Sequence, residues 1–121
     1  MPYSWWCEVA SALMDQWCVV YWNRGPEEVK RVSQSTPREA LEIIPKDLHE
    51  LYTIIRVCNA FAGNDSGPMQ LAAWLNKPLY VAWVVAYRNE WFPWKVTKQA
   101  HGNRLTTVTE ATRRILALLY V

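Results

Sequence analysis

Apolar side chains recur at helical spacing over much of the chain, most clearly in two segments. Residues 47–62 place leucine, isoleucine and other apolar side chains on one stripe, and Gly63 follows as a candidate cap. Residues 69–75 repeat an apolar helical pattern after Pro68, and Asn76-Lys77-Pro78 supplies a short turn. The pattern therefore predicts a core helix and then a helix-turn-helix.

The second helix of that motif is predicted over residues 79–91. Leu79 to Tyr87 is a run of nine apolar residues without a charge, so it also fits a central core helix or a strand. Residues 94–109 alternate β-branched and polar side chains around Gly102-Asn103, a pair suited to the positive φ angles of a tight turn. The sequence predicts a β-hairpin here, followed by a last helix.

The N-terminal region is rich in tryptophan and is predicted to be helical. Residues 4–22 leave little polar face, although residues 17–22 fit a strand equally well. A short charged helix is predicted over residues 27–33, and the capping box Thr36-Pro37-Arg38-Glu39 opens another that ends at Pro45. We therefore expect two parts: residues 1–44, a helical region that can serve in dimerisation, and residues 45–121.

Composition and charge favour a compact protein with an uneven surface potential. Apolar residues make up 51% of the 121 residues, eight of them tryptophan, and no apolar run approaches the ~20 residues of a membrane-spanning helix. The net charge is +2, with an excess of acidic side chains before residue 50 and of basic side chains after it. We expect a cytoplasmic protein without a membrane span.

Few residues suggest catalysis, a metal site or a cofactor. Cys7, Cys18 and Cys58 form no C-x-x-C pair and are interpreted as buried free thiols. His49 and His101 have no nucleophile or acid at a suitable spacing, and the four glycines form no phosphate-binding loop. The sequence therefore predicts neither an enzyme nor a bound cofactor or metal.

The order of elements after residue 46 resembles the winged-helix DNA-binding domain of the MarR type. Residues 47–62 match the helix before the motif, residues 69–75 the supporting helix, residues 79–91 the recognition helix and residues 94–109 the wing. Val108-Thr109-Glu110 is similar to the step that leads into the last helix of that family. The resemblance implies a mainly α fold, a winged helix-turn-helix with one β-hairpin, and a homodimer that regulates transcription by binding double-stranded DNA.

This resemblance also implies which side chains contact DNA. A recognition helix places its first residues against base edges in the major groove, and a basic wing reaches phosphates. The groove candidates are Lys77, Tyr80 and Trp83. The candidates on the wing and for further phosphate contacts are Lys95, Lys98, His101, Asn103, Arg104, Arg88, Arg113 and Arg114.

Other hypotheses remain open because the predicted recognition helix carries no charge. The chain can instead be a non-enzymatic adaptor, also of phage or viral type, that binds a protein partner through Tyr80, Trp83 and Trp91. Aromatic and basic residues around Trp94 and Lys95 can also stack on single-stranded nucleic acid, or simply seat the hairpin. A plain helical bundle is the third hypothesis, if the segments after Pro68 are misassigned.

Overall fold

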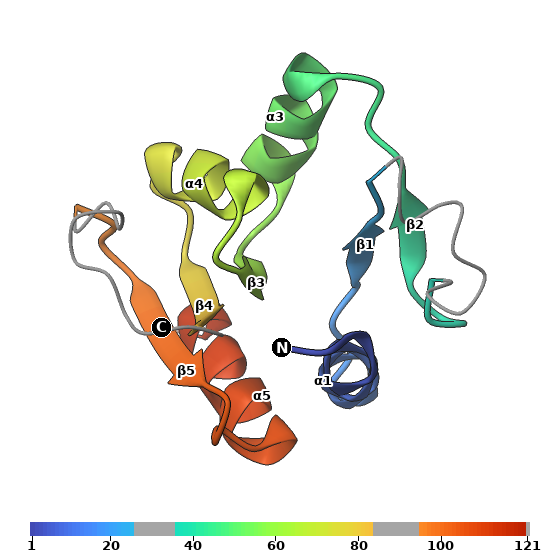
Figure 1. Cartoon of the computed structure of the whole chain (residues 1–121), viewed down its shortest axis with the longest axis vertical. Coiled ribbons are helices and arrows are strands. Elements are labelled where there is room, and N and C mark those ends of the chain that lie inside the picture. Colours follow the sequence, from blue (N-terminus) through green and yellow to red (C-terminus); the bar gives the residue numbers. More distant parts are fainter. Residues whose placement is uncertain (26–35, 84–94, 121) are drawn as a thin grey trace.

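The computed structural model describes residues 1–25, 36–83 and 95–120. Helices and strands alternate along these ranges (Figure 1). The helices are α1 (Tyr3–Asp15), α3 (Leu48–Val57), α4 (Gly67–Trp74) and α5 (Val108–Leu119), and the strands are β1 (Tyr21–Asn23), β2 (Leu41–Ile43), β3 (Phe61–Asn64), β4 (Leu79–Trp83) and β5 (Gln99–Asn103).

The central sheet has the strand order β3-β4-β5, and both of its strand pairs are parallel. Leu79 is the partner of Phe61 on one side and of Gln99 on the other. Parallel neighbours cannot be joined by a tight turn, so a crossover must connect them, and α4 crosses from β3 to β4. All strands of this sheet therefore end at the same edge.

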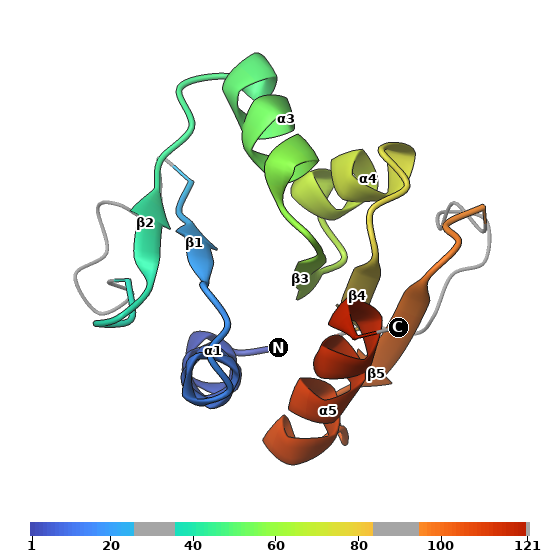
Figure 2. The same cartoon turned by 180° about the vertical axis from the view of Figure 1, so that it is seen from behind.

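Helices cover both faces of the central sheet, which makes a layered α/β arrangement. Leu79, Val81 and Trp83 point to the face where α3 and α4 pack, within one buried apolar cluster. Tyr80 and Ala82 point the other way and pack against α1 and α5 in a second cluster. Figure 2 shows α5 lying along β4 and β5 on that side. Every residue of β4 is buried, as is typical of a central parallel strand.

Strands β1 and β2 form a separate two-stranded parallel sheet, in which Tyr21 is the partner of Leu41. The inner face of β1 contacts α1: the Trp22 ring lies edge to face with the Tyr3 ring, with centroids 5.8 Å apart. Val20, just before β1, packs against the α1–α5 cluster. Both views show this pair beside α1 and apart from the central sheet.

The prediction of a mainly α winged helix is wrong. Residues 79–83 form a buried strand, as the alternative interpretation allowed, and residues 84–91 lie outside the described part of the chain. Gly102-Asn103 does not form the turn of a hairpin, since in the described part of the chain residues 99–103 form a strand that is parallel to β4 and ends at this pair. Two parallel strands with helices on both faces exclude a wing at this place.

The N-terminal predictions also need correction. The first helix ends at Asp15, not at residue 22, and the strand allowed as an alternative over residues 17–22 is present only at residues 21–23. The capping box at Thr36 opens no helix: residues 38–40 form a turn and bend before β2. The charged helix predicted over residues 27–33 lies outside the described residues. The division after residue 44 stays a prediction, although α1 shares a core with α5.

Three helices were correctly predicted, each with a capping residue that the sequence supplies. Asp47 caps α3 by accepting a hydrogen bond from the Glu50 backbone N–H at 2.8 Å. The prediction extended this helix too far: it ends at Val57, and Gly63, the predicted cap, lies in β3. Helix α4 covers the segment expected after Pro68. Helix α5 begins at Val108 behind a capping box of Thr107 and Glu110.

Candidate functional site

The turn between β3 and α4 lies at the edge where the parallel strands end. It runs from Asn64, the last residue of β3, through Asp65 and Ser66 to Gly67, the first residue of α4. In open α/β sheets, ligands bind outside the carboxyl ends of the strands, beside the helices that follow them. This turn is therefore the first place to look for a binding site.

The N-terminus of α4 is well formed and accessible. The Ser66 hydroxyl accepts a hydrogen bond from the Met69 backbone N–H at 3.4 Å, and a proline stands in the first turn, where a missing N–H costs little. Gly67 and Asp65 are exposed, and a Cβ atom added at Gly67 would have no non-neighbouring atom within 4 Å. Open space thus lies in front of a helix end that carries partial positive charge.

Asn64 joins this edge to the start of α1. Its Oδ1 accepts hydrogen bonds from the Met1 amino group at 2.8 Å and from the Trp6 indole N–H at 3.1 Å. Burial lowers the pKa of the Met1 amino group. The amide of Asn64 is therefore engaged in the fold, which leaves Asp65 and Ser66 as the polar side chains of the turn that face solvent or a ligand.

The turn between β5 and α5 is the second polar segment at the same edge. The Asn103 side chain accepts a hydrogen bond from the Leu105 backbone N–H at 2.8 Å, and the Asn103 N–H donates to the Thr106 hydroxyl at 2.9 Å. Thr107 then caps α5. These bonds fix the backbone between strand and helix, while the Arg104 side chain remains exposed.

A histidine is held in one tautomer on the α4 side of the sheet. The Trp83 indole N–H donates to His101 Nδ1 at 2.9 Å, and the two rings stack with centroids 6.1 Å apart. Nε2 must then carry the proton, which it donates to the side-chain Oε1 of Gln99 at 2.8 Å. Burial lowers the pKa of His101, in agreement with a neutral ring.

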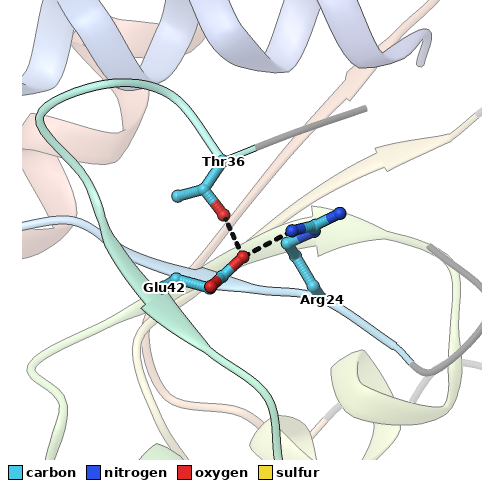
Figure 3. Close-up of polar contacts among 3 residues, drawn as sticks. All are labelled: Arg24, Thr36 and Glu42. Carbon is cyan, nitrogen blue, oxygen red and sulfur yellow. Dashed lines mark hydrogen bonds and ion pairs between the residues drawn. The ribbon is translucent and has the colours of Figure 1, made fainter. Parts of the chain in front are cut away.

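The two-stranded sheet carries an ion pair of its own (Figure 3). The buried Arg24 guanidinium donates to Glu42 Oε1, which also accepts the Thr36 hydroxyl at 2.9 Å. These two hydrogen bonds lower the pKa of Glu42. Arg24 follows β1 and Glu42 lies in β2, so we assign this cluster to the pairing of the two strands.

The residues predicted to contact DNA differ in exposure and in hydrogen-bond partners. Tyr80 and Trp83 are buried at 0% and 4% exposure, so neither can enter a groove or bind a partner protein. Lys77 donates to the Cys58 carbonyl oxygen at 2.8 Å, and Arg114 donates to the His101 carbonyl oxygen at 2.7 Å. The exposed members are Lys95, Lys98, Asn103, Arg104 and Arg113, while Arg88 and Trp91 lie outside the described residues.

Sequence reasoning missed the segment Asn64-Asp65-Ser66-Gly67, which was interpreted only as a turn. A usable signal was present: a short apolar run, polar turn residues, a proline at the start of a helix and then a second apolar run. That order is typical of a βαβ unit, whose first turn faces ligands.

The described residues show no group of three metal-ligating side chains. All three cysteines carry free thiols. Among the helices described, none has the length and apolar character needed to span a membrane.

A comparison with models of protein families matches nearly the whole chain. The model of glycosyltransferase family 9 (heptosyltransferase) matches residues 1–116, nearly the whole chain. Neither the curated proteins nor the solved structures compared with it gave a match. The match overturns the MarR-type resemblance and, with it, the DNA-binding regulator and the non-enzymatic adaptor.

It also corrects the expectation that the protein is not an enzyme, because this family is one of transferases. The layered α/β arrangement agrees with the match, whereas a mainly α winged helix does not. The chain belongs to glycosyltransferase family 9 (heptosyltransferase).

Proposed function

We propose that this chain binds the sugar donor of a glycosyl transfer, and that the donor is a heptose linked to a nucleoside diphosphate. The family description supports the heptose. In such a transfer the bond between the anomeric carbon and the diphosphate breaks, and the diphosphate takes the electron pair. The acceptor hydroxyl forms the new bond and gives its proton to a base.

The N-terminus of α4 is the observation that carries this proposal. Backbone N–H groups and the helix dipole make such an end a binding site for phosphate groups. Here it follows directly on a parallel strand, at the edge where nucleotides bind in open α/β sheets, and the space before Gly67 is open. A diphosphate placed there would meet positive partial charge and the Ser66 hydroxyl.

Asp65 suits the sugar part of the same donor. Its carboxylate is exposed beside Ser66, and a carboxylate accepts hydrogen bonds from sugar hydroxyls without a change in its own charge. It would repel a phosphate, so the diphosphate is expected nearer Gly67 and the sugar nearer Asp65.

The proposal is tested by a pair of substitutions at Gly67, with binding of ADP, UDP and GDP to the purified chain measured by isothermal titration calorimetry. Gly67→Glu places a negative charge at the helix end, which favours the helix but repels a diphosphate. We expect its affinity to fall about tenfold or more below that of the isosteric Gly67→Gln. Equal affinities for the two variants would contradict a diphosphate site at α4.

A second pair of variants separates ligand binding from helix capping. Ser66→Ala and Asp47→Ala each remove an N-cap, and each is expected to cost about 1 kcal/mol of stability. Only Ser66→Ala should also weaken nucleoside diphosphate binding, because α3 begins away from the ends of the central strands. A parallel loss in both variants would show that stability alone governs binding.

A further inference from the structure

The backbone pairing of the two-stranded sheet extends beyond the strands themselves. The Leu41 N–H donates to the Val20 carbonyl oxygen at 2.9 Å, before β1, and the Arg24 N–H donates to the Ile43 carbonyl oxygen at 2.9 Å, after it. Over residues 19–24 the odd-numbered residues are exposed and the even-numbered ones are partly or fully buried. This alternation has the period of a strand, so the sheet has an inner and an outer face.

The outer face of this sheet carries exposed apolar side chains. Val19 is 68% exposed, and Tyr21 and its cross-strand partner Leu41 are each 50% exposed. Paired residues point to the same side of a sheet, so these side chains share one surface. Parallel sheets are normally covered on both faces. Here the inner face packs against α1, whereas the outer face is exposed.

Trp17 lies two residues before Val19, in a backbone conformation that costs stability. The Trp17 and Cys18 N–H groups donate to the Met14 and Leu13 carbonyl oxygens, which is the Schellman pattern that ends a helix. Trp17 has φ = 66°, a region that favours glycine, and its side chain is 95% exposed. Two residues of chain span at most about 7 Å, so this ring is within reach of the outer face. We define the β1–β2 surface as the exposed side chains of Trp17, Val19, Tyr21 and Leu41.

The charges of the two paired segments are turned away from the β1–β2 surface. Arg24 and Glu42 are their charged residues, and the two side chains form an ion pair with one another (Figure 3). Both occupy inner positions, because Arg24 is two residues beyond Trp22 and Glu42 is the partner of Trp22. The outer positions of these described segments therefore carry no charge, and Asn23 is the polar residue among them.

We propose that the β1–β2 surface binds the same surface of a second copy of this chain across a two-fold axis. An uncharged surface meets its own copy without repulsion between like charges. The Asn23 amide both donates and accepts hydrogen bonds, so two copies of it can bond to each other. Tryptophan and tyrosine are among the side chains enriched at the centres of binding energy in protein interfaces. Pairing would thus bury the Trp17 ring, which the single chain leaves in solvent.

The exposed area fits a reversible dimer. From their exposed fractions, the two aromatic side chains offer roughly 300 Å² per chain, and the valine and leucine raise this to on the order of 500 Å². Two copies would then bury about 1,000 Å², which is near the lower limit for a specific interface between proteins. We therefore expect a dissociation constant on the order of 10–100 µM.

A lipid surface is the other partner that exposed aromatic side chains suit, because tryptophan and tyrosine gather at membrane interfaces. The first 50 residues, however, carry an excess of acidic side chains. Anionic headgroups repel such an excess. The charge therefore favours a second copy of the chain.

Sedimentation equilibrium of the purified chain, from about 5 to about 500 µM, tests the pairing. The average mass of the wild type should rise from that of one chain toward that of two. Trp17→Gly removes the ring and relieves the left-handed backbone, so its unfolding midpoint should be unchanged or raised. Its dissociation constant should nevertheless increase about tenfold or more. Trp74→Ala removes another ring, 85% exposed on α4, and should keep the wild-type constant.

Two charge variants of Tyr21 test the two-fold arrangement. Tyr21 lies between Val19 and Leu41 on the β1–β2 surface, so its two copies are expected close to the axis. Tyr21→Lys and Tyr21→Glu would each place like charges there, and each should stay monomeric alone. Mixed in equal amounts, the two variants should form a dimer. A mixture that stays monomeric, or a wild type that stays monomeric at the highest concentration, would overturn the proposal.

Binding to lipid would give a different result. Vesicles of phosphatidylcholine should leave the tryptophan fluorescence of the wild type unchanged. A blue shift that Trp17→Gly abolishes would overturn the pairing and assign the β1–β2 surface to membranes. The pairing does not depend on the donor site at α4, so Trp17→Gly should keep the nucleoside diphosphate affinity of the wild type.

Discussion

Gly102 is required at its position because a tyrosine hydroxyl fills the space of a side chain. An added Cβ would lie 2.0 Å from Tyr80 Oη and 3.0 Å from the Thr106 hydroxyl, while the backbone of Gly102 has no positive φ. The hydroxyl itself is fully buried and has no partner of good geometry among the described residues. Burial raises the pKa of Tyr80, although the nearby Arg114 guanidinium acts in the opposite direction.

This contact predicts a pair of opposite effects on stability. Gly102→Ala should lower the free energy of unfolding by about 2–4 kcal/mol, since the methyl group overlaps a buried oxygen. Tyr80→Phe should be neutral or stabilising, because it removes a buried hydroxyl without a partner, and it should reduce the cost of Gly102→Ala. Urea unfolding of Gly102→Ala, Tyr80→Phe and the double variant measures these changes in the free energy of unfolding. A cost well above 1 kcal/mol for Tyr80→Phe would instead show that Arg114 forms a strong hydrogen bond with it.

At the scale of elements, the sequence predicts the helices better than the strands. Residues 48–57, 67–74 and 108–119 carry caps at their first turns, and these local signals are independent of tertiary packing. Residues 79–83 carry no such signal: both faces of β4 are buried, so the run is apolar throughout and has no period. The strand was therefore an open alternative to a helix.

The sequence shows which polar residues form the site, but it does not show where in the fold they lie. Asn64-Asp65-Ser66-Gly67 is recognisable as a turn before a helix, yet its role depends on the strand before it being parallel to the next. Gly102-Asn103 shows the same limit, since a pair typical of hairpins instead ends a parallel strand. Strand direction is a property of long-range pairing, which a single sequence does not display.

The pairing of β4 with β5 predicts a dependence of stability on pH. The pKa of His101 is lowered from 6.5 in the folded protein, so the unfolded chain takes up the proton first as pH falls. The neutral His101 ring contributes fully to the free energy of unfolding above pH 6.5. This contribution is lost as the pH decreases from 6.5 toward the pKa of His101 in the folded protein. Urea unfolding at intervals from about pH 7.5 to about pH 5 should show this loss.

A substitution identifies the histidine responsible. His101→Gln should flatten the stability profile below pH 6.5, because glutamine takes up no proton. The matched control is His49→Gln, which changes an exposed histidine in the first turn of α3 and should keep the wild-type profile. An unchanged slope in His101→Gln would mean that another group causes the acid sensitivity.

At the scale of the whole molecule, the two terminal helices depend on one another. Helices α1 and α5 cover the same face of the sheet, where Val9, Tyr80 and Ile115 share a cluster. Ile115→Ala should therefore lower the free energy of unfolding by about 2–5 kcal/mol, measured by urea unfolding. Leu105→Ala, which changes a side chain that is 88% exposed, should have almost no effect. Similar losses in the two variants would show that this layer contributes little.

The parallel strand pairs also set the order in which the chain can fold. Paired strands are 18 to 20 residues apart in the sequence, and the packing of α1 on α5 joins segments about 100 residues apart. Contacts between distant segments form late, because closing a long loop costs entropy before any contact compensates it. The βαβ unit β3-α4-β4 can therefore form first, with the face that carries Tyr80 still open to water. During synthesis α1 emerges before this unit and can cover part of that apolar face, but the part that α5 covers stays exposed until α5 has emerged from the ribosome, and over this interval the chain is most prone to aggregate.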